Sequence, residues 1–322
     1  MKALVTGGAG FIGSHLSEAL LKKKWKVYVI DNLSTGNIEN IRHLENSKLF
    51  HFHIDDVTNE KVMKRLIKKV DVVFHLAAAV GVKYILDNPL DSIRTNVRGT
   101  EIVLELANSF GKKKVFLAST SEIYGKNRGD RASFKETDDR LLGSTTRWRW
   151  SYSCTKALDE FLSLAYYREK KLPVTIARFF NTCGPRQTGR YGMVIPRFIK
   201  QALLNNPITV YGDGEQTRCF LYIDDAIKAI TGLVDEKKAV GEIFNIGNPR
   251  GISILELAKR IKKFTKSKSR IDFVPYEKAY EKGFEDMRHR KPDISKIQSF
   301  IKFSPKVEID ELLKRTVKYL ER

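Results

Sequence analysis

A tyrosine and a lysine four residues apart, Tyr152 and Lys156 in "RWSYSCTK", have the residue types and the spacing for proton transfer. Four residues make about one helical turn, so both side chains can lie on the same face of a helix. An ammonium group near a phenol favours the phenolate and lowers its pKa toward that of a useful general base. The same spacing recurs at Tyr166 and at Tyr167, so the pattern by itself does not choose among the three.

Position along the chain distinguishes these tyrosines. Tyr152 opens the predicted helix after the strand that ends in "STSE", so it lies near the carboxyl edge of that strand. Tyr166 and Tyr167 lie about four turns further along, roughly 20 Å away at about 1.5 Å per residue. We therefore predict that Tyr152 reaches the reacting centre. Glu122 follows the same strand, where a carboxylate can take part in catalysis; the alternative is a strand-end glutamate paired with a surface lysine.

The glycines near the N-terminus predict a phosphate site. Gly7, Gly10 and Gly13 in "TGGAGFIG" directly follow the apolar strand "KALVT" and open a helix. A pyrophosphate can rest on the N-terminus of such a helix because no Cβ atom blocks its approach. Asp31 ends the second predicted strand, where a carboxylate accepts hydrogen bonds from an adenosine ribose and repels a 2′-phosphate. The pattern predicts a dinucleotide site that prefers NAD to NADP.

The elements that must position these residues alternate regularly. Short segments rich in β-branched residues predict strands at 2–6, 26–30, 71–77, 113–120 and 173–179, with helical patterns between them. This alternation indicates an α/β fold, a Rossmann doubly wound parallel sheet with helices on both faces. The dinucleotide therefore belongs at the carboxyl edge of a parallel sheet.

The pattern changes after Phe179. A loop rich in Gly, Arg and Thr is followed by a helical segment and by "ITVYGDGEQTRCF", which we interpret as a hairpin. The αβ pattern then returns. We predict that a smaller mixed α/β C-terminal domain is interleaved with the first. The Rossmann domain comprises 1–178 and 219–249, and the second domain comprises 179–218 and 250–322.

Composition limits the class of protein. The 322 residues are 42% apolar and 30% charged, which is ordinary for a globular protein. No apolar run approaches the roughly 18 residues that span a bilayer, and the glycine-rich start does not resemble a signal peptide. We predict a cytoplasmic protein without a membrane partner. The odd number of cysteines fits reduced thiols, and His51 and His53 have no ligand partners at suitable spacing, so no metal is predicted.

The net charge of +20 is the strongest compositional anomaly. Such a charge can serve a nucleic acid, an anionic membrane or an anionic small substrate. Most of the lysines, however, lie in segments that indicate solvated helix faces or turns, and no basic run is interleaved with stacking aromatics. We predict no nucleic-acid partner.

Six motifs in order resemble those of the extended short-chain dehydrogenase/reductase family of nucleotide-sugar epimerases, dehydratases and decarboxylases. They are "TGGAGFIGSH", "HLAA", "STSEIYG", "YSCTK", "RFFNTCGPR" and "GDGEQTRCF". The resemblance covers almost the whole chain and implies tightly held NAD and a smaller domain that binds a nucleoside diphosphate sugar. The predicted cofactor residues are Gly7, Gly10, Phe11, Ile12, Gly13, Asp31, Asn32, Asp56, Val57, Leu76, Ala77, Ala78, Tyr152 and Lys156.

The resemblance also implies roles at the sugar. Thr120 hydrogen-bonds the sugar 4-hydroxyl, Tyr152 removes its proton, and Lys156 tunes Tyr152 and holds the nicotinamide ribose. Hydride passes from C4 to NAD and leaves a transient 4-keto sugar. An NAD-sensing regulator on the same fold is the alternative of another class, and the retained Tyr152 and Lys156 disfavour it. The predicted substrate residues are Lys83, Ser121, Asn181, Arg186, Val194, Arg218 and Arg290.

Ser121 and Glu122 indicate the subfamily. The 4,6-dehydratases of the family typically carry Asp-Glu at this place, and serine is a far weaker acid than a carboxyl group. The 4-epimerases usually have neutral residues at both positions. Thr-Ser-Glu resembles the UDP-glucuronate decarboxylases, in which oxidation at C4 makes a β-keto acid that loses carbon dioxide readily. We predict a UDP-glucuronate decarboxylase, with a UDP-sugar 4-epimerase as the alternative and a 4,6-dehydratase less favoured.

Two further stretches bear on this choice. "EKGFEDMRHRKPDI" resembles a segment of the decarboxylases in which an arginine like Arg290 contacts the substrate, and a planar guanidinium suits a carboxylate. "GVKY" resembles "GVR" of some uronic acid 4-epimerases, so Lys83 keeps the epimerase alternative open. Members of the family commonly dimerise through two helices. Segments 96–110 and 152–167 are apolar enough to supply them, and we predict a homodimer.

Overall fold

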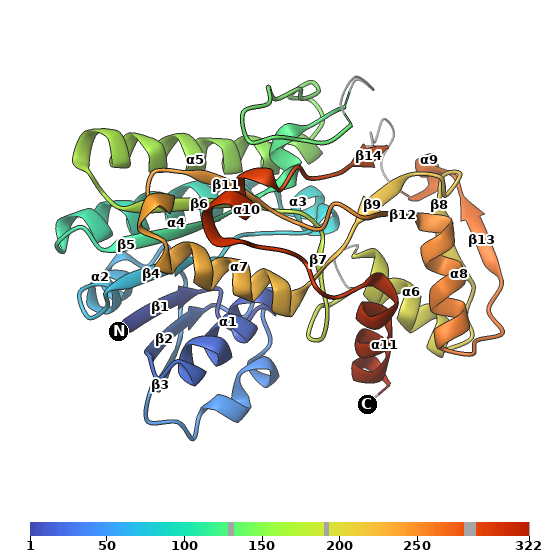
Figure 1. Cartoon of the computed structure of the whole chain (residues 1–322), viewed down its shortest axis with the longest axis horizontal. Helices are drawn as coiled ribbons and strands as arrows, with labels where there is room; N and C mark the ends of the chain where they lie inside the picture. Colours follow the sequence, from blue (N-terminus) through green and yellow to red (C-terminus); the bar gives the residue numbers. More distant parts are fainter. Residues whose placement is uncertain (128–131, 190–192, 280–287, 322) are drawn as a thin grey trace.

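The computed structural model describes residues 1–127, 132–189, 193–279 and 288–321, without the side chains of residues 82, 83, 277 and 279. Within these residues the largest element is a seven-stranded sheet in the order β11-β6-β5-β4-β1-β2-β3 (Figure 1). All its neighbouring strands are parallel, which confirms the predicted Rossmann sheet. Its strands are β1 (Lys2–Thr6), β2 (Lys26–Asp31), β3 (Phe50–Ile54), β4 (Val72–His75), β5 (Lys114–Thr120), β6 (Val174–Phe179) and β11 (Ile243–Ile246).

Helices cover both faces of this sheet, which is why its central strands are apolar on both sides. One face carries α2 (Glu60–Ile67), α4 (Pro89–Ser109) and α5 (Arg149–Lys170), which pack on one another. The other face carries α1 (Phe11–Lys22), α7 (Ile223–Asp235) and α10 (Ser295–Ile301). Figure 1 shows the two layers on either side of the strands. The carboxyl ends of the strands are thereby left free to carry a site.

Local sequence signals begin several helices. The Asn59 side chain accepts a hydrogen bond from the backbone of Val62 at the start of α2, and Pro89 occupies the first turn of α4, where its missing N–H costs nothing. Ser253 caps α8 (Ile254–Phe264) by accepting from Glu256 N, as expected for a serine followed three residues later by glutamate. These ends are set by short-range chemistry.

A second lobe lies beside the carboxyl edge of the sheet. It contains α6 (Val194–Leu203), α8 and α11 (Ile309–Leu320), and a parallel pair of β8 (Ile208–Tyr211) with β13 (Ile271–Val274) (Figure 1). Buried apolar side chains run without interruption from α1 and β1 through α7 into α6, α8 and α11. This continuous core holds the two lobes in one arrangement.

The hairpin that we predicted in "ITVYGDGEQTRCF" is wrong. β8 pairs with β13, whereas β9 (Thr217–Cys219) pairs with β12 (Gly251–Ser253) and β14 (His289–Arg290). Gly212 and Gly214 lie between the two strands with φ of +69° and +78°, a conformation that glycine adopts without a steric cost. The turn therefore directs β9 into a different sheet, and β14 carries Arg290 beside Arg218.

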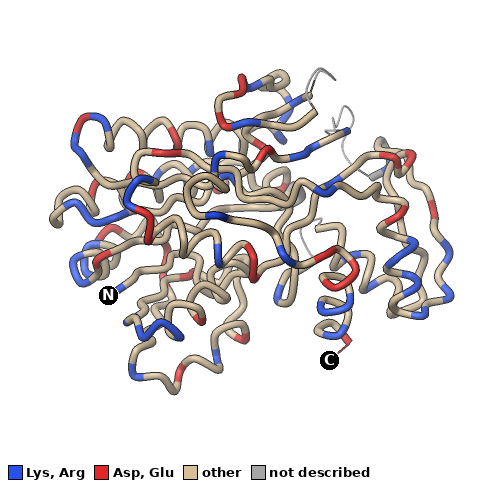
Figure 2. Tube along the Cα trace, viewed as in Figure 1, with Lys and Arg blue, Asp and Glu red and all other residues tan. Residues whose placement is uncertain are grey.

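Short elements complete the chain. Within the described residues no helix is long and apolar enough to cross a membrane. Lys and Arg are distributed over both lobes, with Asp and Glu among them (Figure 2). The remaining elements are η1 (Ile38–Asn40), η2 (Arg42–Leu44), α3 (Val82–Asp87), η3 (Ser121–Tyr124), β7 (Thr182–Cys183), β10 (Leu221–Tyr222), η4 (Lys237–Ala239) and α9 (Tyr276–Ala279).

Candidate active site

A cavity of about 710 Å³ lies at the carboxyl edge of the sheet and reaches into the second lobe. Its size is that of a ligand site, roughly 300 to 1,000 Å³. It includes the point between β1 and β4 where the strand order reverses, the usual place for a dinucleotide. The predicted residues that line it are Gly7, Gly10, Phe11, Ile12, Gly13, Asp31, Asn32, Val57, Leu76, Ala77, Ala78, Thr120, Ser121, Glu122, Tyr152, Lys156, Asn181, Arg186, Val194, Arg218 and Arg290.

One predicted residue is not in this wall. Asp56 does not line the cavity; its carboxylate accepts a hydrogen bond from Asn32 Nδ2 at 2.6 Å and two more from Thr58. Its neighbours Asp55 and Val57 face the cavity instead. The side chain of Lys83 lies outside the described residues, so its predicted contact with a uronate stays a prediction.

The glycine loop is packed so closely against neighbouring backbone that it has no room for side chains at Gly7 and Gly13. Gly7 has φ of +68°, and its N–H donates to Ile30 O at 2.9 Å. A Cβ atom on Gly13 would lie 2.2 Å from Gly7 O, and one on Gly7 would lie 2.9 Å from Ala77. The helix α1 begins directly after Gly10. The loop can therefore bring backbone N–H groups and a helix N-terminus against a pyrophosphate.

Asp31 lies beside this loop at the end of β2. Its carboxylate accepts hydrogen bonds from Ala9 N at 2.9 Å and Leu33 N at 2.8 Å. Burial raises the pKa of Asp31, and these backbone N–H groups partly offset that effect. The carboxylate is thus fixed in direction at the cavity wall, as a ribose-binding acid requires.

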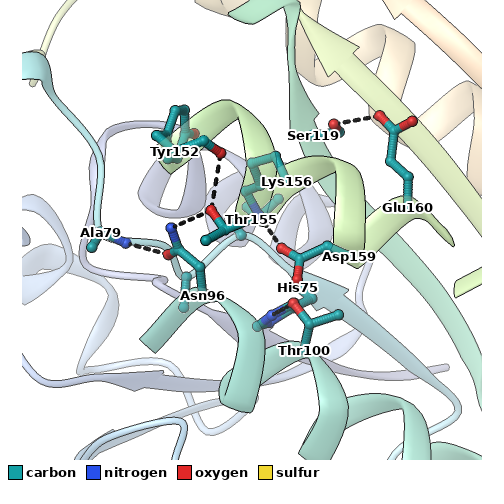
Figure 3. Close-up of polar contacts among 12 residues, drawn as sticks. His75, Ala79, Asn96, Thr100, Ser119, Tyr152, Thr155, Lys156, Asp159 and Glu160 are labelled. Atoms are coloured by element: carbon teal, nitrogen blue, oxygen red, sulfur yellow. Dashed lines mark hydrogen bonds and ion pairs between the residues drawn. The ribbon is translucent and has the colours of Figure 1, made fainter. Parts of the chain in front are cut away.

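Tyr152 and Lys156 both face the cavity from the first turns of α5, but the pKa of Tyr152 is raised overall and not lowered. Burial raises the pKa of Tyr152, Glu122 and Asp159 raise it further, and a hydrogen bond with Thr120 works in the opposite direction. The ammonium of Lys156 pairs with Asp159, with 3.1 Å between Nζ and Oδ2 (Figure 3). The negative charge of Asp159 therefore offsets the effect of the Lys156 ammonium on the pKa of Tyr152.

Glu122 is held between two arginines. Its Oε2 accepts from Arg149 Nη2 at 3.1 Å, and its Oε1 accepts from Arg290 Nη1. Burial on its own would raise the pKa of Glu122, but the charges of Arg290 and Arg149 lower it to about 2. We call Arg149, Glu122 and Arg290 the carboxylate clamp. Glu122 is consequently ionised near neutral pH.

Sequence analysis missed Arg149 and Asp159. Arg149 stands three residues before Tyr152 at the start of α5, so the two side chains share a helix face. That spacing was visible in "RWSY" and could have suggested the residue. Asp159 carries no such signal, because a lysine and an aspartate three residues apart usually form an exposed pair on a helix surface.

The arginines of the second lobe have different surroundings. The Arg186 guanidinium bonds Glu18 and Ser14 on α1, and so connects the loop after β7 to the helix of the glycine loop. Arg218 Nη1 donates to Thr217 O at 2.9 Å. Arg197, which was not predicted, also lines the cavity and lies with its guanidinium 4.2 Å from the centre of the Tyr211 ring. Arg186, Arg197 and Arg218 thus all belong to the cavity wall.

The remaining polar wall residues support the reacting centre. Asn181 at the end of β6 has φ of 25°, and its Nδ2 donates to Cys219 O at 3.2 Å while its Oδ1 accepts from Arg290. Val194 begins α6 at the second-lobe end of the cavity. Among the described residues, no cluster of three or more His, Cys, Asp or Glu is placed to hold a metal ion.

Comparisons with known proteins agree with this geometry. The model of the family described as GDP-mannose 4,6 dehydratase matches residues 4–316. A UDP-N-acetyl-alpha-D-glucosaminuronate decarboxylase of Bacillus cytotoxicus is 46% identical, over 99% of this chain and 97% of the relative. UDP-glucuronic acid decarboxylase 1 of Arabidopsis thaliana is 37% identical, over 98% of this chain and 69% of the relative.

A solved structure shows the same architecture. The UDP-glucuronic acid 4-epimerase of Bacillus cereus, in complex with UDP-glucuronic acid and NAD, matches with a TM-score of 0.90 and 32% identity, over 100% of this chain and 99% of that one. Fold and site define an enzyme of the short-chain dehydrogenase/reductase class. Within it, the chain belongs to the extended, GDP-mannose 4,6-dehydratase-like family of nucleotide-sugar enzymes, which confirms the resemblance of its motifs.

Proposed function

We propose that this protein is an NAD-dependent decarboxylase of a UDP-linked uronic acid. The carboxylate clamp is the main support for this proposal. Two guanidinium groups, of Arg149 and Arg290, face the one carboxylate of Glu122. A charge in a partly desolvated pocket favours a partner of opposite sign. The carboxylate of a uronic acid supplies it, and a neutral hexose does not.

Arg290 has the capacity to bind that carboxylate. Its Nη2 donates to Asn181 Oδ1 at 2.6 Å, and its Nε is buried with no hydrogen-bond partner among the described residues. A buried N–H group without a partner is costly, so a substrate oxygen beside it is favoured. We assign the uronate carboxylate to Arg290, with Asn181 orienting the guanidinium.

The residues present fit NAD. The closely packed glycine loop before α1 suits a pyrophosphate, and Asp31 suits an adenosine ribose without a 2′-phosphate. Bound there, NAD supplies a hydride acceptor at C4 of the sugar. In the proposed mechanism Thr120 orients the sugar 4-hydroxyl, Tyr152 takes its proton, and Lys156 holds the nicotinamide ribose.

Decarboxylation follows from the position of the ketone. A carboxylate on C5 is β to a C4 ketone, so carbon dioxide can leave while the bonding electrons form a C4–C5 enolate. A proton from water then adds to C5 and restores the C4 ketone. Because the pKa of Glu122 is about 2, this residue is ionised and does not donate a proton from its resting state. We assign it an electrostatic role: its negative charge disfavours the departing carboxylate and holds the two arginines in place.

The substrate class is a UDP-linked glucuronic acid with or without an N-acetylamino group at C2. The B. cytotoxicus relative is named for the N-acetylated substrate and the A. thaliana relative for the plain one. Both should be offered to the protein with NAD and followed by proton NMR. A pentose or an N-acetylated pentosamine, together with carbon dioxide, is the expected product. Interconversion of glucuronate and galacturonate without carbon dioxide would overturn the decarboxylase and favour a 4-epimerase.

We also propose the interleaved domain division of 1–178 with 219–249 and 179–218 with 250–322. It is supported by β11, which adds residues 243–246 to the first sheet. α10 is an exception, since it belongs to the second range but packs on β11 and α7. A variant truncated after residue 249 tests this division. Its first domain should lose α10, which covers β11.

A homodimer is proposed through α4 and α5. These helices expose Leu90, Ile93, Leu158 and Phe161, with Phe161 63% exposed. Apolar side chains gathered on two neighbouring helices are typical of a covered surface, and a second copy in the cytoplasm is the proposed cover. Light scattering should give twice the chain mass, and Phe161→Glu should give the monomer.

A further inference from the structure

We propose that Asp159 is a positioning residue, which fixes the ammonium of Lys156 and sets the pH at which Tyr152 and Lys156 exchange a proton with the substrate. The part that concerns catalysis rests on the proposed function. The part that concerns the proton affinity of Tyr152 does not, because it can be measured on the protein alone.

The first support is the geometry of α5. Lys156 Nζ and Asp159 Oδ2 are 3.1 Å apart, and the two side chains are only 2% and 1% exposed. Surface pairs with this spacing contribute little, but this pair lies on the inner face of the helix, next to the reacting tyrosine (Figure 3). A buried carboxylate at this distance holds the ammonium in one position.

The second support is what surrounds Asp159. From α4, Thr100 bonds His75 of β4 at 3.1 Å, and His75 bonds Thr6 of β1 at 2.8 Å. Burial, followed by the charge of Lys156, lowers the pKa of His75 to about 3, so this chain of groups is neutral. The next acid on α5, Glu160, is turned to Arg178 at 2.7 Å and to Ser119. Asp159 is therefore the anion that balances Lys156.

The third support is the set of charges that face Tyr152. From η3 it meets Glu122, which the clamp residues Arg149 and Arg290 compensate, and from its own helix it meets Lys156 and Asp159. Removing one negative charge from this buried group makes proton loss from the Tyr152 and Lys156 pair easier, whichever of the two loses the proton. Asp159 thus keeps a proton on the pair.

This effect has a use in a reaction that runs through oxidation and then reduction at C4. Tyr152 takes the proton of the 4-hydroxyl as C4 loses its hydride, and after decarboxylation it returns the proton to the same oxygen as C4 regains the hydride. A phenol that is too acidic has a phenolate that is a weak base for the first proton, and it loses that proton to water before the second transfer. With Asp159 in place Tyr152 stays a strong enough base for the first transfer and remains protonated for the second.

The direct test is a pH titration by NMR of the protein without cofactor, with tyrosine isotope-labelled at Cζ. Tyr152→Phe identifies the signal. In Asp159→Asn the phenol of Tyr152 should ionise at a pH lower by about one unit or more, the size of a nearby charge effect. An unchanged or higher value overturns the proposal. This result does not depend on any substrate, so it stands apart from a failure of the proposed function.

The kinetic test is the pH profile of NADH formation in a single turnover with a UDP-uronic acid. The acid limb should move to lower pH in Asp159→Asn, more NADH should persist at steady state, and Asp159→Glu should restore the original profile. Asp225→Asn is the matched control, since Asp225 is buried and pairs with Lys228 three residues away on α7. Asp225→Asn should lower the stability of the protein and leave the pH profile of NADH formation unchanged. A shift of the acid limb as large as that in Asp159→Asn overturns the proposal.

A second variant covers the case in which Asp159→Asn does not fold. Thr100→Val retains the carboxylate but removes a neighbouring hydroxyl that lowers the pKa of Asp159 against the larger effect of burial. The carboxylate then holds its charge less well. The acid limb should move in the same direction by a smaller amount, and no movement overturns the proposal.

Discussion

Two charged clusters lie on either side of Tyr152, and they are built in opposite ways. In the carboxylate clamp, which we propose faces the substrate, Arg149 and Arg290 share Glu122, and the Glu122 side chain is 23% exposed. In the other cluster, which we propose faces the cofactor, Lys156 pairs with Asp159, and the two side chains are 2% and 1% exposed. The comparison suggests a general difference between the two clusters. The carboxylate clamp is partly exposed, as a cluster that binds an anionic substrate must be, whereas the Lys156 and Asp159 pair is buried, so its charges stay fixed.

Removing the group that both clusters act on has the largest expected effect. Tyr152→Phe should reduce turnover by about 10²- to 10⁴-fold, the usual contribution of a general acid or base, and leave NAD binding nearly intact. Absorbance of NADH after mixing with a UDP-uronic acid, and calorimetry with NAD, measure the two properties. Tyr166→Phe on the same helix is the control. Greater damage from that variant would mean that the wrong tyrosine was chosen.

Breaking the clamp at its anion should separate the two chemical steps. Glu122→Gln leaves Arg149 and Arg290 without their negative partner, so pentose formation should fall strongly while oxidation at C4 persists. NADH absorbance should then appear and remain, with little pentose in the NMR spectrum. Full activity in this variant would return Glu122 to an ordinary strand-end residue.

Breaking the clamp at one cation should affect binding. Arg290→Ala removes a charge-assisted hydrogen bond to the uronate, which is worth about 1.5 to 3 kcal/mol, or about ten- to a hundredfold in Kd. Calorimetry with UDP-glucuronate measures this loss, and UDP-glucose, which has no carboxylate, is the matched ligand. A similar loss for both ligands would show that Arg290 does not bind the carboxylate.

A comparison of NAD with NADP tests the proposed role of Asp31. Because Asp31 faces the place of a 2′-phosphate, NAD should bind at least about tenfold more tightly, a difference of about 1.4 kcal/mol. Calorimetry gives both constants, and Asp31→Asn should narrow the gap. Equal affinities in the unmodified protein would contradict the assignment of Asp31.

The smallest expected effect is on stability in acid. The pKa of Glu122 is about 2 in the folded protein against an ordinary value of 4.5, so its contribution to stability is present above pH 4.5 and lost as the pH falls through about 2. The thermal midpoint of the unmodified protein should fall more steeply across this window than that of Glu122→Gln. Parallel curves would mean that the clamp does not stabilise the fold.

The sequence alone predicted those parts of the site that depend on short spacings. Gly7, Gly10 and Gly13 lie within one turn and one helix start, and Tyr152 and Lys156 lie one helical turn apart. Backbone geometry over a few residues is nearly the same in every protein, so these residues could be placed without a partner. The parallel sheet was predictable for a related reason, because strands covered on both faces are apolar throughout.

Tertiary structure decided which distant groups meet and how strongly they are charged. Arg290 reaches Glu122 across 168 residues of chain, and it does so because β9 leaves the expected hairpin to pair with β14. Asp159 has the spacing of a surface ion pair and acts on Tyr152 only because its helix face is buried. Strand partners and pKa values depend on contacts and on exclusion of water, and neither is encoded in a short stretch of sequence.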